Sequence, residues 1–158
     1  MIALLIAAAI VAAPSHECEA PAYRHEERAI RADTRYQLRE VSTERERAAS
    51  VYARCRATGA APAAREDALA GVNLATAATY AWMFRDHARG CSLMARGIAL
   101  IDRARREGPL SPDERQMTGD VLREFRHDLR DGRARWFRDG RRHSCAFDGN
   151  TGALPVVP

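Results

Sequence analysis

The chain has 158 residues, of which 46% are hydrophobic and 29% charged, and its formal net charge is +4. This length suits one domain with a substantial core. All 25 basic residues are arginine, and acidic residues are interspersed among them. Mixed charge of this kind is typical of solvated helix faces, so we expect no nucleic-acid partner.

The first segment resembles a secretion signal in its composition. Residues 2–13 consist only of Ile, Ala, Leu and Val. About a dozen apolar residues match the core of a signal peptide and fall short of the ~20 that a bilayer span needs. Ala13 and Ser15 supply small side chains for cleavage before His16, although a basic n-region is missing. We predict a signal peptide over residues 1–15 and a periplasmic or secreted protein without stable membrane insertion; a retained anchor is the alternative.

Four cysteines are distributed along the chain: Cys18, Cys55, Cys91 and Cys145. An even number in a small exported protein predicts two disulfide bonds, for which three connectivities exist. No two of the cysteines form a C-x-x-C pair, which argues against a thioredoxin-like redox motif, a zinc ribbon and c-type haem attachment. We expect no cofactor.

A first helix is predicted from Ala22 to about Arg56, a stretch without Gly or Pro. It carries a narrow apolar stripe at helical spacing, interrupted by Arg45. The stripe is either a coiled-coil surface for a partner, to be tested at Thr34–Val41, or one seam of the core. Its members are Thr34, Leu38, Val41, Ala48, Tyr52 and Cys55.

A second helix is predicted from Pro62 to Arg89. Its middle, Leu74–Phe84, is apolar nearly all round, which is typical of a central buried helix. Gly90 is expected to stop this helix, and Cys91 to open a third helix that continues to about Glu107.

The fourth helix has the clearest local signal. Ser111 to Glu114 reads SPDE, which contains an N-cap serine, a proline at the first helical position and the glutamate of a capping box. We expect the helix to end near Gly132 or to continue to Phe137. Residues 139–158 contain several Gly and Pro and no helical period, which predicts an irregular tail.

The fold class is therefore all-α: an antiparallel four-helix domain over residues 16–138, after a cleaved signal peptide and before the tail. In this arrangement the start of the first helix lies near the end of the second. We expect the disulfide bonds Cys18–Cys91 and Cys55–Cys145.

Two histidines provide the sharpest chemical hypothesis. Asp86 and His87 lie near the end of the second predicted helix, and His127 and Asp128 lie on the fourth. If these helices pack together, the four side chains could form a metal or acid–base cluster. Exposed polar helix ends explain the same residues. No nucleophile elbow, P-loop or dinucleotide fingerprint is present.

We expect a non-enzymatic interaction or accessory protein of the cell envelope, with another envelope or secreted protein as its partner. Recognition through a helix face is the expected mechanism. The alternative is a metal-binding protein or a hydrolytic enzyme with a site near His87 and His127.

Overall fold

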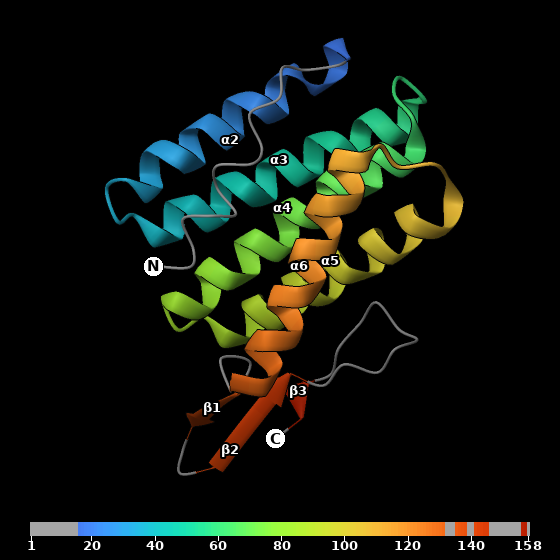
Figure 1. Cartoon of the computed structure of the whole chain (residues 1–158). Coiled ribbons are helices and arrows are strands. Elements are labelled where there is room, and N and C mark those ends of the chain that lie inside the picture. Colours follow the sequence, from blue (N-terminus) through green and yellow to red (C-terminus); the bar gives the residue numbers. More distant parts are fainter. Residues whose placement is uncertain (1–15, 132–134, 139–140, 146–155, 158) are drawn as a thin grey trace.

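The domain is built mainly of helices. The computed structural model describes residues 16–131, 135–138, 141–145 and 156–157, with side chains described for residues 16–125 and for Cys145. Helices α2 to α5 lie side by side in chain order, and α6 crosses the face of α4 and α5 (Figure 1). The elements are η1 (Glu17–Glu19), α2 (Ala20–Asp33), α3 (Leu38–Thr58), α4 (Ala63–Met83), α5 (His87–Glu107), α6 (Pro112–Asp131), β1 (Arg135–Arg138), β2 (Arg141–Cys145) and β3 (Val156–Val157).

The predicted all-α class is confirmed for this domain. Within the described ranges, no helix combines the length and the apolar composition that crossing a bilayer requires. The predicted signal peptide, residues 1–15, lies outside the described residues.

The predicted first helix is in fact two helices joined by a tight turn. α2 ends at Asp33 and α3 begins at Leu38. Tyr36 adopts a left-handed conformation with φ of 57°, and the amide of Gln37 donates to the carbonyl of Ala32 over 2.9 Å. This bond closes a Schellman motif, whose left-handed position is usually glycine. The prediction of one helix was wrong because a tyrosine occupies that position, so no Gly or Pro marked the break.

The α2–α3 hairpin determines the disulfide connectivity. It returns the chain on itself, so that Cys18 in η1 bonds to Cys55 near the end of α3, with Cα atoms 5.7 Å apart. Cys91 in α5 bonds to Cys145 at the end of β2, with Cα atoms 5.4 Å apart. Two disulfide bonds are thus present as predicted. The predicted pairs Cys18–Cys91 and Cys55–Cys145 are wrong because they assumed a single long first helix.

The apolar stripe of α3 belongs to the core. Val41, Tyr52 and Cys55 are all buried, and Val41 packs with Tyr80 of α4. Thr34 is the residue that caps the end of α2. The seam interpretation is therefore confirmed for the part of the stripe from Val41 to Cys55, whereas Thr34 lies exposed at the end of α2.

α4 is the central buried helix, as its sequence predicted. Most of its side chains are buried, and α3 and α5 pack against it. A Cβ atom on Gly71 would lie 2.8 Å from the carbonyl oxygen of Gly97, and one on Gly97 would lie 2.8 Å from that of Gly71. These two glycines therefore allow the backbones of α4 and α5 to come into direct contact.

The boundary between α4 and α5 lies earlier than predicted. α4 ends at Met83, and α5 begins at His87. Gly90 lies inside α5, where an added Cβ would clash with the indole ring of Trp82. The predicted stop at Gly90 was wrong because this glycine makes room for a neighbouring side chain and does not end a helix.

The start of α6 is confirmed as a capping box. The amide of Ser111 donates to Oε2 of Glu114 over 2.8 Å, and the amide of Glu114 donates to Oγ of Ser111 over 3.2 Å. Pro112 is the first residue of the helix.

Short strands follow α6, where the sequence predicted a helix that ends near Gly132 or continues to Phe137, and then an irregular tail. β1 pairs antiparallel with β2, with Arg138 opposite Arg141, and β3 pairs antiparallel with the other edge of β2. The sequence between β1 and β2 is Asp139–Gly140, a pair that favours two-residue hairpin turns. This hairpin signal was present in the sequence and was missed.

Candidate functional site

The structure places the residues of the predicted metal or acid–base cluster at the ends of two helices. The carboxylate of Asp86 accepts a hydrogen bond from the amide of Arg89 at 3.4 Å and caps α5. His87 is half-buried, and burial together with a nearby arginine lowers its pKa. The side chains of His127 and Asp128, on α6, lie outside the described ones. Among the described residues, no three His, Cys, Asp or Glu side chains gather as metal ligands.

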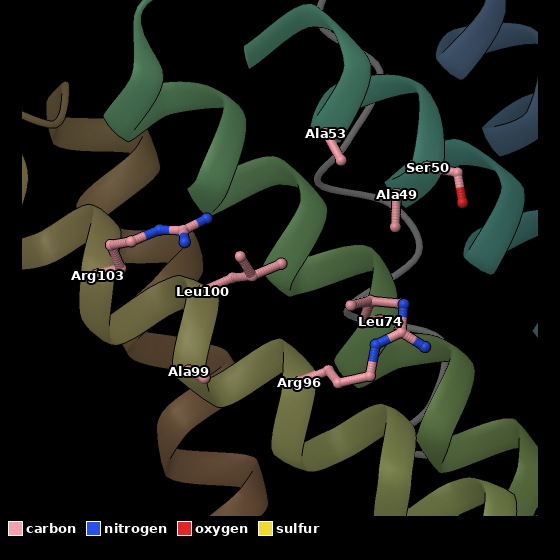
Figure 2. Close-up of a pocket in the computed structure, with 8 residues that line it drawn as sticks. All are labelled: Ala49, Ser50, Ala53, Leu74, Arg96, Ala99, Leu100 and Arg103. Atoms are coloured by element: carbon pink, nitrogen blue, oxygen red, sulfur yellow. The ribbon is translucent and has the colours of Figure 1, made fainter. Parts of the chain in front are cut away.

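A groove between α3 and α5 is the candidate binding site. Its volume is about 380 Å³, within the range of ligand-binding clefts. Figure 2 shows the side chains of α3 on one wall, those of α5 on the other, and Leu74 of α4 between them. The lining residues are Ala49, Ser50, Ala53, Leu74, Arg96, Ala99, Leu100 and Arg103.

Small side chains on α3 keep the groove open. Ala49 and Ala53 project too little to fill the space beside α5. The hydroxyl of Ser50 donates to the carbonyl of Glu46 over 3.0 Å, so its hydrogen bond lies within its own helix. Leu100 is half-buried and therefore presents apolar surface to the groove. The middle of the groove is apolar for these reasons.

Arg96 is an exposed cation on the α5 wall. Its Nη1 lies 3.8 Å from Oε1 of Glu46, which is beyond hydrogen-bond distance. The other oxygen of Glu46 accepts from Nη2 of Arg89 at 2.7 Å. Since a guanidinium group has five N–H donors, Arg96 is able to bind an anionic ligand without losing a strong internal bond.

Arg103 is the second cation of the wall, and it is held in place. Its Nε and Nη2 donate to the two oxygens of buried Asp67, each over 2.6 Å. Arg56 donates to the same carboxylate over 2.8 Å and to Glu107 over 3.1 Å. The hydrogen bonds to Asp67 raise the pKa of Arg103. The groove lining thus includes two arginines and no acidic residue.

Sequence reasoning missed a buried polar network between α2, α3 and α4. Oε1 of Glu26 accepts from the hydroxyl of Tyr52 at 3.1 Å and from Nδ2 of Asn73 at 2.8 Å. Arg45 donates to Oδ1 of Asn73 over 3.2 Å. Burial raises the pKa of Glu26. The one signal in the sequence was Arg45, the charged residue that interrupts the apolar stripe of α3.

A second buried cluster joins the N-terminal ends of α2, α4 and α6. Arg65 donates to Glu19 over 3.0 and 3.3 Å and to Glu114 over 2.6 Å. Glu66 is fully buried, and neither of its carboxyl oxygens accepts a hydrogen bond from a described residue. Burial and the neighbouring Glu19 carboxylate raise its pKa to about 8. Glu66 is therefore protonated at neutral pH, which suits a structural role in the core.

In the groove, apolar and cationic side chains reach solvent together. The two buried clusters consist mainly of inaccessible groups that hold helices in place. Comparison with protein-family models, with curated proteins and with solved structures finds no match to this chain.

Proposed function

We propose that the protein is an exported, non-enzymatic interaction protein and that the groove between α3 and α5 binds an acidic, amphipathic segment of a partner protein. The observation that carries this proposal is the apolar groove whose lining includes Arg96 and Arg103 and no carboxylate. Complementary charge around an apolar contact provides specificity and faster association.

The spacing of the two arginines favours a helical segment. Arg96 and Arg103 are seven residues apart on α5, which is about 10.5 Å along the helix axis. A partner helix lying along α5 would match them with acidic side chains two turns apart. Its apolar residues between those positions would contact Ala53, Leu74 and Leu100 in the groove. This is the helix-in-groove mode of recognition.

Export is part of the proposal. Disulfide bonds persist mainly in oxidising compartments, so the pairs Cys18–Cys55 and Cys91–Cys145 support a periplasmic or secreted location. We expect the mature protein to begin at His16. An intact mass of the exported protein before and after reduction tests this: retention of Met1 together with free thiols would contradict it.

Capture experiments with groove variants test the binding site. The immobilised mature protein is incubated with the extracytoplasmic fraction of the source cells, and bound proteins are quantified by mass spectrometry. Ala99→Glu places a carboxylate on an exposed position of the groove wall, where it repels an acidic segment. Ala63→Glu places the same charge on an exposed alanine at the start of α4, outside the groove lining.

We expect one partner to be lost with Ala99→Glu, weakened with Arg96→Gln and retained with Ala63→Glu. A synthetic peptide of its most acidic helical segment should then bind the wild-type protein, and more weakly as salt is raised. Equal capture by the wild type and by Ala99→Glu would contradict the proposal.

A further inference from the structure

Two turns meet at one end of the helical layer. Residues 34–37 connect α2 to α3, and residues 84–86 connect α4 to α5 (Figure 1). The guanidinium carbon of Arg39, in the first turn of α3, lies 5.0 Å from the ring centroid of Phe84. This contact joins the two turns into one surface, here named the two-turn end, which includes Met83.

Both turns place a side chain where a glycine would be less strained. Tyr36 and Arg85 have φ of 57° and 66°, and they are the non-glycine residues with positive φ in the described chain. Each occupies the left-handed position of a Schellman motif. The same motif ends α3, where the amide of Ala60 donates to the carbonyl of Cys55 over 3.2 Å and Gly59 has φ of 68°. Only at the two-turn end does the described chain display a large side chain at this position.

The side chains of the two-turn end are hydrophobic and basic. Tyr36 and Met83, with 88% and 50% of their surface accessible, are the exposed large hydrophobic residues of the described chain. Arg35 and Arg85 are exposed, and neither forms an ion pair with a described residue.

Exposed arginines outnumber exposed acidic residues at this end: Arg35, Arg39 and Arg85 against Glu40. Asp33 is half-buried, and burial together with this neighbouring carboxylate raises the pKa of Tyr80, while Asp86 caps α5. Glu40, in the first turn of α3, is the exposed acid there. Arg31, in the last turn of α2, adds a further arginine close to this end; its Nη1 lies 3.8 Å from Oε2 of Glu27.

We propose that the two-turn end docks reversibly on an anionic phospholipid surface. Tyrosine is enriched at membrane interfaces, and Met83 at the same end would add apolar contact with the upper acyl chains. Arg35 and Arg85 would bind headgroup phosphates, for which the guanidinium fork is well suited. This surface is separate from the groove, so the proposal stands independently of the partner proposed above.

Vesicle co-sedimentation of the mature protein tests the charge requirement. We expect binding to vesicles of phosphatidylglycerol and phosphatidylcholine, and little binding to vesicles of phosphatidylcholine alone. Arg35→Gln and Arg85→Gln should each weaken the partition roughly fivefold. Arg105→Gln and Arg106→Gln, each made singly, are the matched controls, because each removes one positive charge at the other end of α5 and should leave binding unchanged.

The variant Tyr36→Gly distinguishes loss of the exposed tyrosine side chain from loss of the fold. Glycine relieves the left-handed strain, so this variant should resist urea better than the wild type while binding anionic vesicles more weakly. Absence of wild-type binding, equal binding to both vesicle types, or unchanged binding by Tyr36→Gly would overturn the proposal. Dimerisation that Tyr36→Gly abolishes, without vesicle binding, would assign the surface to a second copy of the chain and equally overturn it.

Discussion

Replacing Glu66 by glutamine should remove a pH-dependent loss of stability. Glu66 lies buried beside Glu19, Arg65 and Asp67, and burial and Glu19 raise its pKa from 4.5 to about 8. The folded protein therefore keeps this proton at pH values where the unfolded chain has lost it. Because unfolding releases the proton, the free energy of unfolding should fall as pH rises from 4.5 to about 8, and level off above. At about 1.4 kcal/mol per pH unit, the upper bound of the fall is roughly 5 kcal/mol.

Urea unfolding followed by tryptophan fluorescence, across this pH range, measures the effect. Glutamine has nearly the shape of the protonated acid and is likewise uncharged, but it does not titrate. The variant should therefore match the wild type near pH 4.5 and become increasingly more stable than it toward pH 8. Glu27→Gln, at an exposed position of α2, is the control and should show no such trend. A stability difference between Glu66→Gln and the wild type that is constant with pH would refute the reasoning.

Three further predictions follow from the helix contacts, the disulfide bonds and the predicted histidine site. Gly97→Ala should destabilise the fold by about 1–3 kcal/mol, seen as a lower melting temperature, because its Cβ meets the backbone of α4; an unchanged melting temperature would contradict the close contact. Replacing both Cys18 and Cys55 by serine should cost about 2–4 kcal/mol in urea unfolding, and full retention of stability would show that this bond is absent. Calorimetric titration with zinc should give no stoichiometric heat; tight binding that is lost in His87→Ala would instead favour the metal-binding alternative.

Two features of the fold were predictable from short stretches of sequence: the start of α6 and the burial of α4. The capping box at Ser111 and Glu114 needs only residues three apart, and the buried character of α4 follows from its composition. The turn at Tyr36 was not predictable in the same way, because its left-handed residue is not glycine. That single turn also changed the disulfide connectivity, since it reversed the direction of the chain between Cys18 and Cys55.

The candidate site depends on contacts between helices, which periodicity does not reveal. Arg96 and Arg103 are two of 25 basic residues, and nothing local distinguishes them. They line a groove only because Gly71 and Gly97 bring α4 and α5 together while small residues of α3 leave the other wall open. Glu26 and Asn73 likewise pair only after three helices have packed.

Site-specific photo-crosslinking tests the central claim, that the groove holds an acidic segment of a partner. A photoreactive amino acid is introduced at Ala53 on one wall, at Ala99 on the other, and at Ala63 as a control outside the groove lining. We predict that both wall positions cross-link to the same partner, within one helical segment that carries acidic residues two turns apart. Cross-links from Ala63 alone, or to unrelated segments from the two walls, would contradict the account.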